Sequence, residues 1–135
     1  MTTQLGRASM PQSPDAPDRM EGMVPGVRAG GFLFLSAIRG RHPKTNTMPE
    51  DGYEQAVQAL SNLEAVLRGS GATLAHVVKV TLYLHDLEMR KPFHRAWLEF
   101  FAKNPPARIA VCVANANAAP GGNAHYALDV IALAP

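Results

Sequence analysis

The chain has 135 residues, and Lys and Arg outnumber Asp and Glu by 13 to 11, which leaves a net charge of +2. This length suits one domain, and 47% hydrophobic against 18% charged residues argues against disorder. So small a net charge does not indicate the basic surface that a nucleic-acid partner requires. The single cysteine, Cys112, excludes an internal disulfide. No apolar run could span a membrane and no signal core is present, so we expect a cytoplasmic protein without a membrane partner.

The sequence pattern of the first third of the chain changes near residue 22. Residues 1–22 contain three prolines and no apolar periodicity, which predicts a loose N-terminal tail without regular elements. Residues 23–135 are expected to form a single domain. A short strand is expected at 24–27, and the apolar, aromatic-rich run at 31–38 predicts a buried strand.

Two helices and three strands are expected in the remainder. Residues 50–68 repeat apolar side chains every three or four positions, as one face of a helix does. Residues 76–84 alternate in the pattern of a strand, and a second helix is expected from 89 to 103, before two prolines. Two further strands are expected at 107–113 and 125–133.

The expected order is β-β-α-β-α-β-β, which favours an α+β fold: a mixed sheet with both helices on one face. We interpret Gly121 and Gly122 as a hairpin turn between the last two strands. The uncovered sheet face would carry Ala110 and Cys112 or their alternates, all apolar. An apolar face of that size indicates oligomerisation.

Common ligand motifs are missing. The histidines show no H-x-x-x-H or H-E-x-x-H spacing, and the glycines form neither a G-x-G-x-x-G nor a G-x-x-x-x-G-K loop. We therefore expect no metal and no cofactor. Cys112 lies in an apolar run, which is typical of a small buried hydrophobe rather than a nucleophile.

Arg108 stands out chemically. It opens an apolar strand, where an arginine is costly unless it is paired. Its planar guanidinium suits a carboxylate, and the small Ala110 and Cys112 leave space for a ligand. The residues alone also allow an arginine that reaches solvent from the strand end or pairs with Asp129.

The segment PPARIAVCV (105–113), after a helix that ends in EFF, resembles the RidA/YjgF family of imine/enamine deaminases, whose older label is L-PSP endoribonuclease. The resemblance covers about residues 22–132. It is carried by GMVPGV (22–27), FLSAI (34–38), QALSNLEAVLRGSGA (58–72), VVKVTLYLHDL (77–87) and PAR (106–108).

The resemblance implies a chorismate-mutase-like fold and a homotrimer with ligand sites in clefts between subunits. It implies cofactor-free hydrolysis of small 2-imino or 2-enamino acids to a 2-keto acid and ammonia. Arg108 matches the arginine that binds the substrate carboxylate, and Ser36 matches a serine that lines the same cleft. The expected partner is a small metabolite that bears a carboxylate.

Other cleft positions depart from the family pattern. Met23 stands where the family has a tyrosine, Ala37 where it has a glycine, and Ala110 where it has a cysteine. His94 replaces an asparagine, and Ala127 replaces the glutamate that activates water. The altered residues make the pocket more apolar, which predicts a bulkier or less polar ligand.

Three functions follow from these departures. In the first, the protein is a deaminase whose water is oriented by His94, His125 or Asp129. The last two of these alternate with Ala127 on one strand face. Alternatively, it is a trimer that binds a small carboxylate through Arg108 without catalysis. The third function, a ribonuclease or RNA binder, is the weakest, because the charge is small and no basic-aromatic stripe is present.

Overall fold

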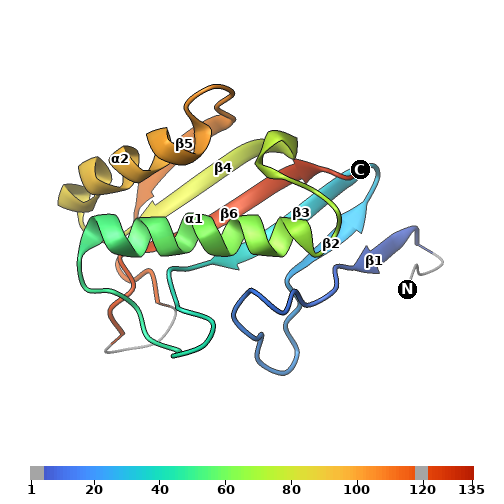
Figure 1. Cartoon of the computed structure of the whole chain (residues 1–135), viewed down its shortest axis with the longest axis horizontal. Helices are drawn as coiled ribbons and strands as arrows, with labels where there is room; N and C mark the ends of the chain where they lie inside the picture. Colours follow the sequence, from blue (N-terminus) through green and yellow to red (C-terminus); the bar gives the residue numbers. More distant parts are fainter. Residues whose placement is uncertain (1–4, 118–121) are drawn as a thin grey trace.

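A computed structural model describes residues 5–117 and 122–135. Its helices are α1 (Gly52–Arg68) and α2 (Arg90–Phe101), with short 3-10 turns at Leu74–His76 and Leu87–Met89. Its strands are β1 (Arg7–Ser9), β2 (Gly26–Ala29), β3 (Phe32–Ile38), β4 (Val77–Leu84), β5 (Ala107–Cys112) and β6 (Tyr126–Leu133). The strands form one sheet in the order β1-β2-β3-β6-β4-β5, and both helices lie over the same face of it (Figure 1).

The expected mixed α+β architecture is confirmed. Neighbouring strands run antiparallel except β4 and β5, which are parallel because α2 carries the chain between them. The expectation of a hairpin turn at Gly121–Gly122 is wrong, because β6 lies between β3 and β4 and does not pair with β5. Gly121 itself lies outside the described residues. The buried pattern of β6 explains its place, since hydrogen bonds on both edges satisfy a backbone that water cannot reach.

The N-terminal segment is more ordered than its prolines predict. Residues 7–9 form β1, which pairs with β2 and extends the sheet at its edge. Met10 and Ala16 are buried and belong to the hydrophobic core. The expectation that this segment holds no regular element is therefore wrong: the prolines begin at Pro11, after β1, and leave its backbone free to pair.

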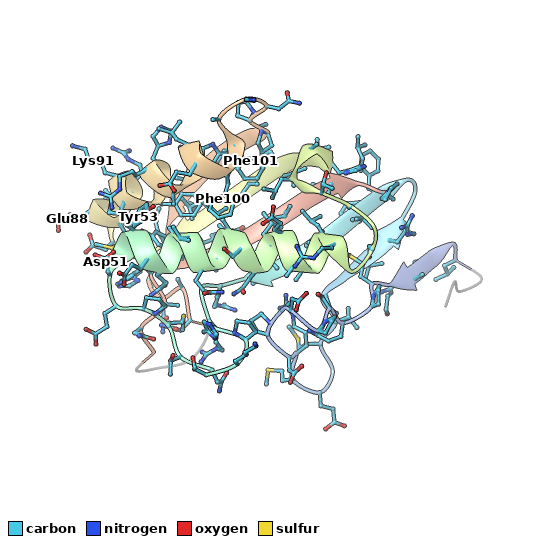
Figure 2. The ribbon with its side chains drawn as sticks, in the orientation of Figure 1. Asp51, Tyr53, Glu88, Lys91, Phe100 and Phe101 are labelled. Atoms are coloured by element: carbon cyan, nitrogen blue, oxygen red, sulfur yellow. The ribbon has the colours of Figure 1, made fainter. Side chains whose placement is uncertain are left out.

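The core fills the space between the helices and the covered sheet face. Asp51 begins α1 by accepting a hydrogen bond from the Glu54 backbone amide at 3.0 Å, and an apolar stripe of the helix then packs on the sheet. Tyr53 lies between the two helices (Figure 2), where its hydroxyl bonds Glu99 and its ring lies 4.0 Å from the Arg95 guanidinium. Each fully buried leucine contributes about 2 kcal/mol by leaving water.

The opposite face of the sheet is open and apolar, as the sequence predicts. Phe34 is 45% exposed and Ile109 is 53% exposed, and Phe32 and Leu133 are also exposed. Strand alternation puts these side chains opposite the buried Leu33 and Leu35. Assembly through this face stays a prediction. Among the described residues, no helix has the length and hydropathy needed to cross a bilayer.

Candidate functional site

Arg108 is held against the aromatic face of α2. It pairs with the fully buried Val80 of β4, so its side chain leaves the sheet on the helix-covered side. The guanidinium carbon lies 4.6 Å from the Trp97 ring centroid and 5.9 Å from that of Phe93. Its Nη2 donates to Nδ1 of His94 at 3.1 Å. Because a guanidinium only donates, this bond requires His94 to present an unprotonated Nδ1.

The charge of Arg108 has no acidic counterpart. Within the described part of the chain, its Nη1 is buried without a hydrogen-bond partner, and no carboxylate lies within ion-pair distance. Burial lowers the pKa of Arg108, since the charged form loses hydration. A buried donor without an acceptor is costly, so an acceptor that reached Nη1 would remove that cost.

The expected contact between Arg108 and Asp129 is wrong. Asp129 lies opposite Thr81 and is exposed, on the open face of the sheet, whereas Arg108 lies on the helix-covered side. Strand β4 also separates β5 from β6, which holds Asp129. Within the single chain Asp129 therefore needs no buried partner, because water reaches its carboxylate.

The three candidates for orienting water lie in different places. His94 touches Arg108 directly. His125 precedes β6, stacks on His85 with ring centroids 6.1 Å apart, and bonds the Glu50 carbonyl through Nε2 at 2.6 Å. Asp129 lies on the open face. Only His94 is thus brought to the Arg108 guanidinium by this fold.

The remaining cleft positions on β5 and β6 are small. Ala110 and Cys112 are exposed and lie along β5 on the same side as Arg108. The Cys112 thiol lies 3.7 Å from the His85 carbonyl oxygen, which differs from the buried cysteine expected. Ala127 pairs with Tyr83 and is 5% exposed, and its methyl group offers no proton acceptor.

Ser36, Met23 and Ala37 lie far from Arg108 in this chain. Ser36 is exposed near the end of β3, on the open side. Strands β6 and β4 separate β3 from β5, so the two positions are about 14 Å apart across the sheet at the usual strand spacing. The candidate substrate-binding residues therefore form two groups within one protomer.

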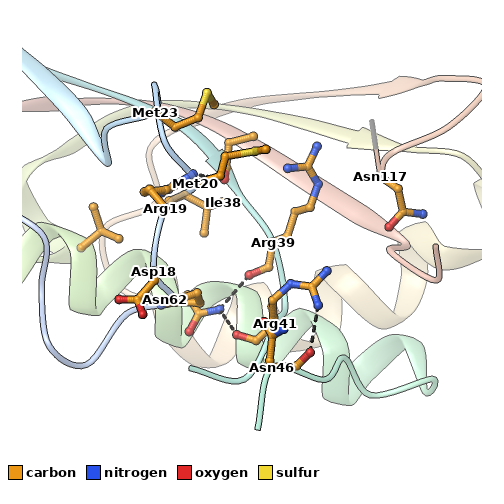
Figure 3. A pocket seen from close by; sticks show the side chains of 13 residues that line it. Asp18, Arg19, Met20, Met23, Ile38, Arg39, Arg41, Asn46, Asn62 and Asn117 are labelled. Atoms are coloured by element: carbon orange, nitrogen blue, oxygen red, sulfur yellow. Dashed lines mark hydrogen bonds between the residues drawn. The ribbon is translucent and has the colours of Figure 1, made fainter. Parts of the chain in front are cut away.

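Met23 and Ala37 line a cavity of about 470 Å³ at the end of β3 (Figure 3). Arg19, Arg39 and Arg41 line the same cavity, so its wall is charged as well as apolar. Sequence reasoning missed these arginines, which lie in the N-terminal tail and directly after the strand expected at 31–38. The R-G-R spacing at 39–41 was the available signal, since alternate residues of an extended segment share a side.

Metal-binding geometry is not found in the described ranges 5–117 and 122–135. No group of three or more His, Cys, Asp or Glu side chains there could hold an ion. The stacked pair His85 and His125 brings two imidazoles together, but one ring nitrogen of His125 already bonds a backbone carbonyl.

Comparisons with known proteins agree with this architecture. The family model for endoribonuclease L-PSP matches residues 13–124. The chain is 36% identical over 86 residues to the RutC family protein PH0854 of Pyrococcus horikoshii, covering 63% of this chain and 68% of that one. It is 34% identical over 89 residues to the chloroplastic Reactive Intermediate Deaminase A of Arabidopsis thaliana, covering 65% of this chain and 48% of that one.

A solved structure extends the likeness to the fold. The crystal structure of E. coli TdcF with bound serine superposes with a TM-score of 0.81 at 26% identity, covering 90% of this chain and 95% of that one. The family match includes most of both groups of candidate residues, from Met23 to Arg108. The chain therefore belongs to the endoribonuclease L-PSP family, which is the RidA/YjgF family that its motifs resemble.

Proposed function

We propose that the protein is a hydrolytic deaminase of small 2-imino or 2-enamino acids, which it converts to the 2-keto acid and ammonia. Arg108 holds the substrate carboxylate. The observation that carries this proposal is the Arg108 guanidinium, fixed by Trp97 and His94 and without an acidic partner among the described residues. Two parallel N–H donors in a fixed fork match the geometry of a carboxylate.

Two relatives support the substrate class. The Arabidopsis relative carries the name of a deaminase of reactive intermediates. The E. coli structure was solved with serine, a small molecule whose carboxylate an arginine suits. The name agrees with a deaminase, and the bound serine agrees with a small ligand that carries a carboxylate.

The two groups of candidate residues favour a site shared between copies. Arg108 and His94 lie at the β5 edge, whereas Ser36 and Ala37 lie on β3, about 14 Å away across the sheet, and Met23 shares a cavity with Ala37. The exposed apolar face between them is of the kind that a second copy covers. In the proposed homotrimer, Arg108 of one subunit faces the β3 group of its neighbour.

The proposed reaction needs little beyond positioning. Water adds to the electrophilic iminium carbon, a proton moves from the added oxygen to the nitrogen, and ammonia leaves as the carbonyl forms. Arg108 fixes the carboxylate next to that carbon, which orients the carbon for attack by water. His94 accepts from Arg108 through Nδ1, so its Nε2–H is left as a donor for the added oxygen.

A second candidate is a trimer that binds a small carboxylate without hydrolysing it. Ala127 favours this alternative, because an alanine at the family's glutamate position cannot accept a proton from water. His94 is the group that stands closest to Arg108 and distinguishes the two functions. With His94 able to orient water the protein is an enzyme, and without that role it is a binding module.

A coupled assay separates the two. An amino-acid oxidase generates 2-imino acids in situ from several amino acids, and keto-acid and ammonia release are followed with and without the protein. The deaminase proposal expects faster release with wild type and none above background with Arg108→Ala. Unchanged rates across all side chains would remove the deaminase. Calorimetric titration with the same keto acids would then test the binding module.

A further inference from the structure

The cavity at the end of β3 concentrates positive charge. Arg19 comes from the N-terminal segment, and Arg39 and Arg41 come from the loop that follows β3 (Figure 3). Burial lowers the pKa values of Arg19 and Arg39, and a neighbouring arginine lowers each further. Like charges gathered in a partly buried space cost free energy, and a bound anion would remove that cost.

Each guanidinium is anchored by a neutral acceptor and keeps free donors. Arg19 Nη1 donates to the Ala37 carbonyl at 3.0 Å, Arg39 Nε to the Ala116 carbonyl at 2.8 Å, and Arg41 Nη1 to the Asn46 carbonyl at 2.9 Å. A guanidinium has five N–H donors, so one such bond leaves most of its donors available.

Acidic neighbours do not neutralise this cluster. Asp18 lines the cavity, but within the described ranges it forms no ion pair with any of the arginines. In Figure 3 its carboxylate points away from Arg39 and Arg41. The cavity therefore holds more positive than negative charge.

A buried amide fixes the arginine-bearing loop. Asn62 of α1 is 2% exposed, and its Nδ2 donates to the carbonyls of both Arg39 and Arg41 at 2.8 Å. Gln58 orients that amide by donating to its Oδ1 at 3.0 Å. Two bonds from one rigid donor hold the backbone on which both arginines stand, so Asn62 is a positioning residue for the cluster.

We propose that this cavity binds a small, doubly charged oxyanion, either a dicarboxylate or a phosphate monoester. Three guanidiniums around one cavity carry more positive charge and more donors than a single carboxylate can satisfy. The paired N–H donors of each guanidinium match the oxygens of a carboxylate or of a phosphate. A volume of about 470 Å³ admits a small metabolite, and Met20, Met23 and Ile38 supply apolar wall for its carbon skeleton. The site shares Met23 and Ala37 with the β3 side of the proposed substrate cleft, but it does not require Arg108, and its three arginines have no role in the proposed deaminase.

Calorimetric titration at constant ionic strength tests this site. The probes are succinate for a dicarboxylate, glycerol 2-phosphate for a phosphate monoester, and acetate as the single-charge control. One or both dianions should bind at least about tenfold more tightly than acetate, and the tighter one identifies the source. Equal or undetectable binding of all three would overturn the proposal.

Matched variants locate the ion. Arg39→Gln and Arg41→Gln should each weaken dianion binding about tenfold or more, as loss of a charged hydrogen bond does. Arg28→Gln is the control, because Arg28 also donates to a main-chain oxygen, that of Pro135 at 3.2 Å, and lies outside the cavity. The hydrogen bond from Arg41 to Asn46 is exposed to solvent, so Arg41→Gln should leave the fold intact. That variant therefore tests the site even if Arg39→Gln unfolds the protein.

The remaining outcomes are decisive too. Asp18→Asn should tighten binding, because it removes the acidic group from the cavity lining. An equal loss of dianion affinity in Arg28→Gln would mean that binding depends only on the net charge of the protein, and it would overturn the site. Loss in Arg108→Ala instead would put the anion in the proposed substrate cleft, which overturns the separate site but leaves the deaminase standing.

Discussion

The two arginine-bearing regions of the molecule are built in opposite ways. At the β5 edge, one guanidinium lies over the aromatic rings of α2 and bonds a histidine. At the end of β3, three guanidiniums stand around an open cavity, each tied to a backbone carbonyl. The first region fixes one cation rigidly, and the second gathers several.

This difference indicates different ligands. A single fork on a rigid strand suits one carboxylate held next to a reacting carbon. Several arginines on loops, around a cavity, suit recognition of total charge. The β5 edge is therefore the better candidate for chemistry, and the cavity is the better candidate for selecting an anion.

The largest effect is expected from the open sheet face that separates the two regions. Phe34→Glu puts a carboxylate at a position whose wild-type side chain is 45% exposed in the single chain. That position is buried in the proposed trimer. An unpaired buried charge costs several kcal/mol, which weakens assembly by about 1,000-fold or more. Sedimentation velocity should show monomers where wild type is trimeric.

Leu98→Glu provides the control for that substitution. Leu98 is 52% exposed on α2, away from the open sheet face, so its variant should keep the assembly of wild type. A trimeric Phe34→Glu protein would mean that this face is not the interface, and the two regions would then have to act separately.

Arg108 should give the next largest effect. Arg108→Ala removes both donors of the carboxylate fork and should lower affinity for a small carboxylate about 100-fold. Arg108→Lys keeps the charge without the fork and should recover only part of that loss. Titration with pyruvate measures both variants. Full affinity in the lysine variant would show that charge alone is recognised at the β5 edge.

His94 should have a smaller effect. His94→Ala removes the acceptor of Arg108 Nη2 and lets the guanidinium leave its place over Trp97. Loss of one hydrogen bond of about 1 kcal/mol predicts roughly fivefold weaker carboxylate binding. His94→Gln, whose amide oxygen can accept the same bond, should restore it. A variant that binds normally but no longer releases ammonia would assign His94 to the water instead.

The last effect is on stability alone and concerns the aromatic support beneath Arg108. Tyr126 is fully buried, packs on Phe93 with centroids 5.0 Å apart, and donates to the Met89 carbonyl at 2.7 Å. Burial, followed by the charge of Asp51, raises the pKa of Tyr126 above its ordinary value near 10. The unfolded chain therefore loses this proton first, so stability is unaffected below pH 10 and falls as pH rises above it.

Urea unfolding between pH 8 and pH 11 checks this sign. Above pH 10 the contribution of Tyr126 falls by up to about 1.4 kcal/mol per pH unit, and Tyr126→Phe should remove that slope. At neutral pH the variant should lose about 1 kcal/mol for the missing hydrogen bond. A slope that is identical in both proteins would assign the loss of stability to other groups.

Periodicity predicted the layered fold well. The apolar stripe of α1 and the alternation of β4 both indicate which side is buried. Side chains that pack on a core recur with the period of the helix or strand that carries them. Strand order could not be obtained that way. The place of β6 between β3 and β4 depends on long-range pairing, which leaves no local pattern in the sequence.

The candidate site shows the same division. Arg108 could be found from its motif and from the cost of an arginine in an apolar strand. Its contact with His94 joins residues 14 positions apart and needed the structure. The arginines of the cavity were missed because Arg19 and Arg39 are 20 residues apart and meet only where the N-terminal segment returns to the end of β3.

Mixing of inactive subunits tests the shared site most directly. Arg108→Ala removes one side of the proposed cleft, and Ser36→Trp blocks the other side from the open face of β3. Each variant alone should fail to accelerate release of ammonia from 2-imino acids. Refolded together in equal amounts, they should regain activity at about a quarter of the clefts, those that receive both native sides. Mixtures as inactive as their parents, with mixed trimers confirmed by mass spectrometry, would contradict a site built from two subunits.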